Sequence, residues 1–448
     1  MKAHWQQDQS LIEEYASLER AALDGTLRPV VFIVATTRKF DLIAFEKSLK
    51  NSLNGSNLLL SKELIHLFIG HCQTVPMRED PDFLNILKFS MGTENFDSND
   101  ISVARRFQRE LAAKACSILD NPILVMLDDD LRFEAAYLSG GDVKIGYPFS
   151  YIHEVYNFAE RFSCDIALGG VTGSPPLPAT STMRTFLQDF LSFSAIDSCK
   201  TRWKEPDYYY DLSETRTNWD AWQIIETPEK ADNNADFFLN QIFFSGSKNR
   251  PLVVTDLPSN QLVSKAIIRG GNTVVYNSRY ITDIKHPQMS RRGDSIWSIL
   301  ASQKGAKILR FPAPLYHDRN CGEYEIESLE KRMIDDLFGA SLQRAMLDDL
   351  HGFEYILKER CNHQISLIDE CLKLILLAQD TFPKKRGHVG TLWGLPKKER
   401  KRFLQICKEV LTSLEGNLAN YISNIKDNVE YGTVLAKSLR YDLERMVI

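Results

Sequence analysis

The sequence of 448 residues lacks long hydrophobic runs, paired cysteines and an excess of basic charge. Its longest apolar stretches, such as VVFIVATT and ILVML, are far shorter than the roughly 20 residues that cross a bilayer. The first 23 residues contain acidic side chains where a secretion signal needs an apolar segment. None of the eight cysteines stands in a CxxC pair, and the net charge of -5 argues against general nucleic-acid binding. We therefore expect a soluble, cytoplasmic protein with no nucleic-acid partner.

Short apolar segments alternate with segments of helical period in the first three quarters of the chain. Such alternation predicts an α/β fold with an open, mostly parallel sheet and helices on both faces. The strand at 165–171 is expected to be interrupted at Gly169-Gly170, and the strand at 307–311 is expected to end at Pro312. The other predicted elements are strands at 30–35, 64–69 and 123–127 and helices at 42–53, 101–118 and 150–162.

The pattern divides the chain into three parts. Apolar residues from Trp5 to Ala22 recur at helical spacing, which predicts an N-terminal helix within residues 1–27. The α/β pattern occupies residues 28–322. From 323 to 448, Leu, Ile and charged residues with little glycine predict an all-α region of three to five helices.

Three adjacent acids, Asp128, Asp129 and Asp130, follow the apolar strand ILVML. Ligands of open α/β sheets bind beyond the carboxyl ends of the strands. Adjacent carboxylates repel one another, and a divalent cation such as Mg²⁺ or Mn²⁺ offsets that repulsion. If the segment is extended, Asp128 and Asp130 point to the same side and can face one metal–diphosphate group. The alternative is a solvated acidic loop with Asp128 as a helix cap.

A second group of candidates lies in the segment HPQMSRRGDSIWSIL. Asp294 follows Gly293 and precedes an apolar helix, so Asp294 or Ser295 is expected to be the helix N-cap. The same position can aim a carboxylate at a cleft, as a general base requires. Arg291 and Arg292 beside it are candidate diphosphate contacts, and the alternative is that both are simply solvated.

Two further candidates are a histidine and an arginine. His317, in FPAPLYHDRN, can complete a Mn²⁺ shell, although a lone histidine is more often an ordinary polar residue. Arg105, on the helix before the acidic segment, can neutralise phosphates or lie on an exposed helical face.

Together these segments resemble nucleotide-sugar glycosyltransferases of the GT-A fold, the family 2 type in particular. The resemblance rests on the ordered series VVFIVATTRK, SVARRFQRELAAKA, LDDD, RRGDS and the late His317, over roughly residues 28–320. The chain has Arg106 where the family usually has asparagine, and it lacks the glutamate of the Gly-Glu-Asp motif.

The resemblance implies a role for each candidate. Asp294 would be the base that deprotonates an acceptor hydroxyl, with inversion at the sugar. Asp130 and His317 would bind Mn²⁺ or Mg²⁺ at the donor diphosphate. The donor, most simply a UDP-sugar, would contact Thr36, Thr37, Arg38, Arg105, Asp128 and Asp129.

An aromatic stretch and a basic stretch suggest partners. Sugar rings stack on aromatic side chains, so an acceptor loop is one interpretation of the stretch that contains Trp203, Tyr209, Trp219 and Trp222; a small hydrophobic cluster is the other. The acceptor would be a glycan, a lipid-linked molecule or a protein. The basic loop 384–402 is best explained as a solvated charge run, with peripheral membrane contact or a phosphate-bearing acceptor as alternatives. The C-terminal helices are a candidate surface for homo-oligomer formation.

Two other functions fit parts of the pattern. A sugar-phosphate nucleotidyltransferase also holds Mg²⁺ with aspartates, but it usually has a glycine-rich loop after the first strand, whereas ATTRKF contains no glycine. A non-catalytic module could instead retain the fold and bind a glycan or a protein.

Overall fold

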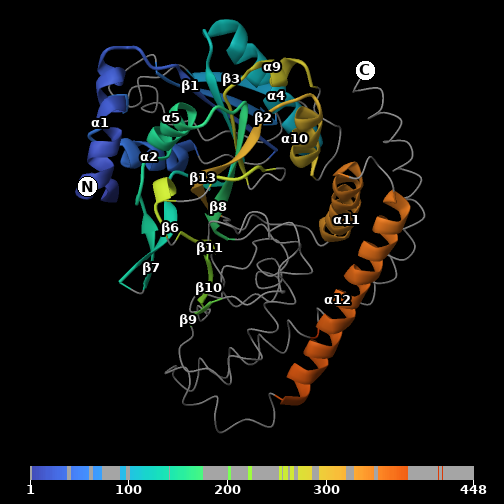
Figure 1. Cartoon of the computed structure of the whole chain (residues 1–448). Coiled ribbons are helices and arrows are strands. Elements are labelled where there is room, and N and C mark those ends of the chain that lie inside the picture. The colour runs from blue at the N-terminus through green and yellow to red at the C-terminus, as the bar shows by residue number, and fades with distance from the viewer. Residues whose placement is uncertain are drawn as a thin grey trace.

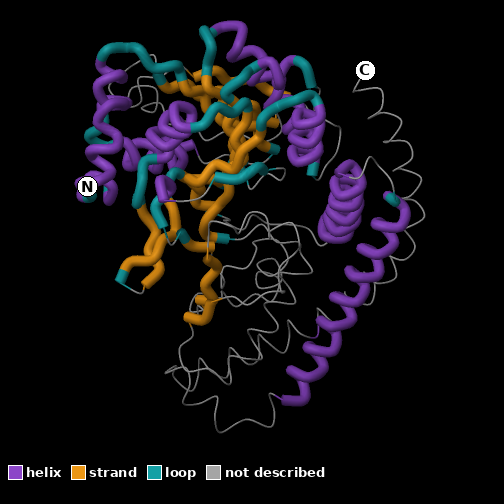
Figure 2. Tube along the Cα trace, viewed as in Figure 1, coloured by secondary structure: helices purple, strands orange, loops and turns teal. Residues whose placement is uncertain are grey.

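The apolar runs of the sequence form one mixed sheet in the computed structural model (Figures 1 and 2). Its first four strands are parallel, in the order β3 (Met91–Phe96), β2 (Ile65–Cys72), β1 (Val30–Thr36) and β4 (Ile123–Leu127). The structure describes residues 3–37, 42–59, 64–72, 91–96, 101–140, 142–174, 200–202, 220–224, 252–254, 256–260, 263–266, 271–284, 292–318, 327–347 and 352–381, with 412 and 416.

The other half of the sheet contains antiparallel pairs. Strand β12 (Asn272–Val275) runs antiparallel between β4 and β8 (Ile166–Gly173), and β13 (Ile308–His317) runs parallel to β8. The α/β class expected from the sequence is confirmed, and the sheet is mixed. The remaining strands are β5 (Leu131–Arg132), which pairs with β13, the hairpin β6 (Ala135–Ser139) and β7 (Asp142–Gly146), and the extension β11 (Leu252–Val253), β10 (Asp220–Ile224) and β9 (Lys200–Arg202).

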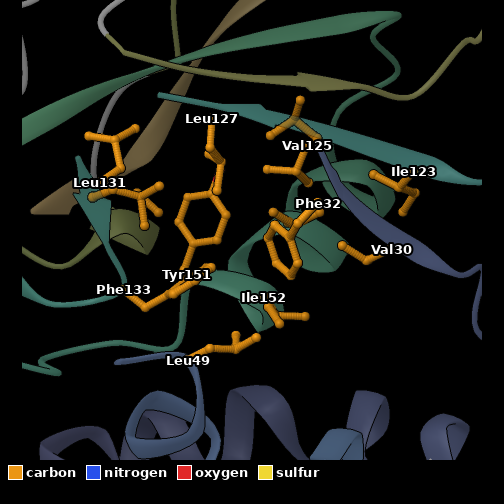
Figure 3. Packing of buried hydrophobic residues seen from close by; sticks show 14 of the residues in the cluster. Val30, Phe32, Leu49, Ile123, Val125, Leu127, Leu131, Phe133, Tyr151 and Ile152 are labelled. Atoms are coloured by element: carbon orange, nitrogen blue, oxygen red, sulfur yellow. The ribbon is translucent and has the colours of Figure 1, made fainter. Parts of the chain in front are cut away.

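Helices cover both faces of the sheet, because successive residues of a buried strand point to opposite sides. In β1, Phe32 belongs to the core on one face and Ile33 to the core on the other. The first face is covered by α1 (Gln9–Leu23), α2 (Leu42–Leu53) and α5 (Tyr151–Arg161), and Figure 3 shows part of its packing. The second is covered by α4 (Ile101–Ile118), α9 (Arg279–Thr282) and α10 (Gly293–Gln303). Short 3-10 turns are η1 (His4–Gln7), η2 (Asn57–Leu59) and η4 (Pro258–Asn260).

Two strands are longer than the sequence pattern predicts. The interruption expected at Gly169-Gly170 is wrong, because β8 continues through both glycines to Gly173. A Cβ at Gly169 would lie 1.9 Å from the Asn272 side chain of β12, so this glycine allows a close neighbour and does not break the strand. The end expected at Pro312 is also wrong, because β13 continues to His317. Its register against β8 shifts between Phe311 and Leu315, and such an irregularity accommodates prolines that cannot donate to the ladder.

The C-terminal region begins with two helices, α11 (Glu327–Leu347) and α12 (Phe353–Thr381). Helix α11 lies between α10 and α12 (Figure 1). Its Phe338, Leu342 and Met346 belong to the same buried cluster as Trp297 of α10. This part of the helical region therefore extends the core of the sheet's second face. The basic loop 384–402 lies outside the described residues. Among the helices that the structure describes, none is long and apolar enough to span a bilayer.

Helix α1 packs on α5 through buried polar side chains. The Tyr15 hydroxyl donates to Glu154 Oε1 at 2.5 Å, and His153 Nε2 lies 2.8 Å from Glu19 Oε1. Burial raises the pKa of Glu154 to about 7 and lowers the pKa of His153. As pH rises, the contribution of Glu154 to stability therefore falls, whereas the contribution of His153 rises.

The raised pKa of Glu154 predicts that replacing this residue with glutamine stabilises the protein, by an amount that depends on pH. Since the folded-state pKa exceeds the ordinary value of 4.5, the stabilisation from this group is complete below pH 4.5 and is lost as pH rises through about 7. We expect Glu154→Gln to raise the free energy of unfolding by roughly 3 kcal/mol at about pH 8.5, where His153 is neutral, and by much less at about pH 5. Urea denaturation at both pH values measures this, with the exposed Glu13→Gln on α1 as control. Equal gains at both pH values would contradict it.

Candidate functional site

The acidic segment after β4 folds into a turn. The Leu131 amide donates to the Asp128 carbonyl at 3.3 Å. The extended conformation assumed from the sequence is therefore wrong, and the three aspartates have different partners. Asp129 Oδ2 accepts from the Thr36 hydroxyl at 2.5 Å, which joins the ends of β1 and β4. Thr37, which follows Thr36 in the sequence, is half-buried.

Strand β13 brings His317 to this turn. His317 lies opposite Leu131 in the antiparallel pair of β13 and β5, and the Asp318 amide donates to the Asp130 carbonyl at 2.9 Å. His317 Nε2 lies 3.3 Å from Asp130 Oδ2, and both side chains are largely buried. On the other side of the ring, Nδ1 lies 2.6 Å from the Ser174 carbonyl. The continuation of β13 past the two prolines is what places this imidazole beside the carboxylate.

The hydrogen bond to Ser174 restricts the chemistry of the His317–Asp130 contact. A backbone carbonyl can only accept, so Nδ1 carries the proton of that bond. Nε2 then presents either a lone pair or a second proton to the Asp130 carboxylate. A lone pair facing a buried carboxylate is unfavourable unless a cation lies between them. The arrangement therefore fits either an imidazolium ion pair or a metal ion held by both side chains.

The spacing and donor types also fit a metal ion. Two ligands each about 2.1 Å from one ion at right angles lie about 3 Å apart, close to the 3.3 Å observed. A histidine that ligates through Nε2 commonly donates Nδ1–H to a backbone carbonyl, as His317 does to Ser174. Within the described part of the chain, no third His, Cys, Asp or Glu joins this pair to form a ligand cluster. Any other ligands would come from solvent, a substrate or other parts of the chain.

Helix α4 contributes two arginines to the site. Gln108 donates from Nε2 to the carbonyls of Ile33 at 2.8 Å and Leu127 at 2.9 Å, which fixes α4 against the ends of β1 and β4. Arg105 lies between two carboxylates: it is 3.2 Å from Asp128 Oδ1 and forms an ion pair with Asp294. Arg105 thus connects the turn after β4 with helix α10.

Asp294 is held by a second arginine that the sequence analysis did not identify. Arg109 Nη2 lies 3.9 Å from Asp294 Oδ1, and its guanidinium stacks 3.7 Å from the centre of the Trp297 ring. Asp294 is only 8% exposed, and burial of a carboxylate is tolerated when such charges accompany it. Arg109 follows Arg105 by one helical turn, so the spacing in the sequence was the signal for it.

The expected N-cap role of Asp294 or Ser295 is wrong. Helix α10 begins at Gly293, its N-cap is Arg292, and Asp294 lies in the first turn. Arg292 has a left-handed backbone with φ of 64°, and its guanidinium lies 3.3 Å from Asp336 of α11. The Asp294 side chain is therefore directed to the arginines of α4 instead of capping its own helix.

The remaining candidates lie where the structure does not describe their side chains. Trp222 is on β10, and only its backbone is described. Arg38, Arg291, Trp203, Tyr209 and Trp219 lie outside the described residues. Their roles remain predictions.

No protein-family model matches the sequence, and no curated protein matches it. Among solved structures, the chain is similar to S. aureus TarS, residues 1–349. The two chains are 10% identical, the comparison covers 90% of this chain and 92% of that chain, and the TM-score is 0.24. A TM-score this low does not establish a common fold.

Proposed function

We propose that the protein is a metal-dependent glycosyltransferase that moves a sugar from a nucleotide-diphosphate donor to an acceptor hydroxyl. The proposal is carried by the contact between His317 Nε2 and Asp130 Oδ2, two buried groups that could hold a divalent cation between them. It is supported by the ordered motifs of the sequence, whose segments meet at the end of β4. One nitrogen and one carboxylate oxygen suit Mn²⁺ better than Mg²⁺, which prefers ligands that are almost all oxygen. When bound, the ion would offset the negative charge that develops on the diphosphate leaving group.

Asp294 of α10 would act on the acceptor side, under the control of two arginines of α4. A general base needs a carboxylate oxygen that can accept a proton, and Arg105 and Arg109 both contact the Asp294 carboxylate. Arg105 already contacts two anionic side chains, and a donor diphosphate would compete for the same guanidinium. Movement of Arg105 toward the diphosphate would release one oxygen of Asp294 for the acceptor hydroxyl. Arg109 would continue to orient the other oxygen, at 3.9 Å.

A donor-hydrolysis assay tests this function. The full chain is incubated with a panel of nucleotide sugars, UDP-sugars first, with Mn²⁺ or with EDTA. We expect release of nucleoside diphosphate with at least one donor in Mn²⁺ and none in EDTA. Pyrophosphate formed from a nucleoside triphosphate would favour a nucleotidyltransferase. No release and no Mn²⁺-dependent thermal shift with any donor would favour a binding module.

A further inference from the structure

The first turn of α10 is held from two directions. From α4, Arg105 and Arg109 contact the Asp294 side chain. From α11, Asp336 contacts Arg292, two residues before Asp294. The first turn of α10, which carries the Asp294 carboxylate, is therefore contacted both by α4 of the α/β body and by α11 of the C-terminal region.

The backbone conformation of Arg292 is one that neighbouring contacts must stabilise. A φ of 64° is unfavourable for a residue with a Cβ, whereas glycine adopts it readily. Such conformations persist when surrounding contacts hold them. Here the Arg292 guanidinium pairs with Asp336 at 3.3 Å, with side-chain exposures of only 18% and 20%. The Arg292 carbonyl also accepts from the Ile296 amide at 3.0 Å, so this residue starts the helix that carries Asp294.

Helix α11, which carries Asp336, packs against α10 through buried apolar side chains. Phe338 and Leu342 of α11 lie in the same buried cluster as Ile296 and Trp297 of α10. Burial of these side chains fixes the two helices against each other, and Figure 1 shows α11 beside α10. Asp336 thus approaches Arg292 from a helix that packs directly against α10.

We propose that Arg292 and Asp336 are positioning residues for Asp294, so that α11 forms part of the framework of the site. The inference rests on the proposed function for its effect on turnover. Its structural part, the fixing of the first turn of α10, does not depend on any substrate.

Two variants and one control test the proposal. Arg292→Gly keeps the left-handed backbone and removes the guanidinium, and Asp336→Asn removes the partner's charge. Asp335→Asn is the matched control on α11, one residue away. Hydrogen–deuterium exchange of the Ile296 and Trp297 amides is measured without substrate. We expect each variant, but not the control, to increase exchange about fivefold or more, through local opening of the first turn.

The effect on turnover is measured with the donor found in the hydrolysis assay. We expect kcat to fall about tenfold in Arg292→Gly and in Asp336→Asn, with the KM for the donor unchanged, because misplacement of a reacting group affects the chemical step. The double variant should lose no more than either single one, since both remove the same ion pair.

The outcomes distinguish the two proposals. Exchange and kcat that match the Asp335→Asn control would overturn the positioning role, as would increased exchange with unchanged kcat. If no donor is turned over by the wild type, the proposed function fails, and the exchange experiment still decides whether the ion pair holds α10.

Discussion

Asp130→Asn is expected to abolish Mn²⁺-dependent donor binding. The substitution keeps the size of the side chain and replaces the charged oxygen that faces His317 Nε2 at 3.3 Å with a neutral amide. Loss of a group that only supports a metal ligand costs roughly 10–100-fold in affinity, and the loss of a ligand should cost at least as much. Isothermal titration of a nucleoside diphosphate, with and without Mn²⁺, measures the change. Asp24→Asn, an exposed aspartate that follows α1, is the control.

Asp130→Asn also distinguishes the two interpretations of this contact, a bound metal ion and an imidazolium ion pair. If Asp130 and His317 form only an imidazolium ion pair, Mn²⁺ will not stabilise the wild type against heat, and Asp130→Asn will lower the melting temperature in EDTA. If they bind a metal, Mn²⁺ raises the melting temperature of the wild type and leaves that of the variant unchanged. His317→Gln should behave like Asp130→Asn, with the exposed His363→Gln of α12 as its control. Retained Mn²⁺-dependent binding in Asp130→Asn would remove this residue from the metal site.

Asp294→Asn is expected to retain donor binding or tighten it, because Arg105 loses a carboxylate that competes with the diphosphate, and to lower kcat by about 100-fold or more, the usual effect of losing a general base. Asparagine keeps the shape of the side chain but cannot accept the proton of the acceptor. Steady-state kinetics with the acceptor, together with donor titration, separate turnover from binding. The melting temperature must be recorded as well, because the substitution removes a buried carboxylate charge that contacts both Arg105 and Arg109.

Persistence of turnover in Asp294→Asn would give this residue a different role. Asp294 would then be a structural counter-ion for the arginines of α4, and the base would have to be sought elsewhere. A matched loss of donor binding and turnover would likewise contradict the acceptor-side role, because a base acts after the donor has bound.

Much of the α/β framework could be predicted from the sequence. Apolar runs predicted β1 and β4, and helical periodicity predicted α2 and α4, each within a residue or two of its bounds. Buried strands and amphipathic helices can be recognised in this way because each has its own pattern of apolar residues. The errors came from residues that usually end strands. Gly169 makes room for Asn272, and the prolines of β13 lie where the register shifts. Such accommodation depends on neighbouring strands, which a single segment does not reveal.

The candidate site was predictable as a set of residues but not as a set of contacts. The acidic segment, His317 and Asp294 stand out because carboxylates and an imidazole at strand and helix ends are candidates for metal binding and proton transfer. Their pairing is tertiary: the turn at Asp128 sends each aspartate to a different partner, and β13 delivers His317 from far along the chain. Asp336 carried no signal in the sequence, because α11 reads as an ordinary helix until its place beside α10 is known.

The most direct test of the central claim is a crystal structure of the protein with Mn²⁺ and a nucleoside diphosphate, with anomalous data collected to locate manganese. The proposal predicts one strong anomalous peak within about 2.3 Å of both Asp130 Oδ2 and His317 Nε2, in contact with the diphosphate oxygens. A diphosphate bound elsewhere, or an Asp130–His317 contact with no anomalous peak at saturating Mn²⁺, would contradict it.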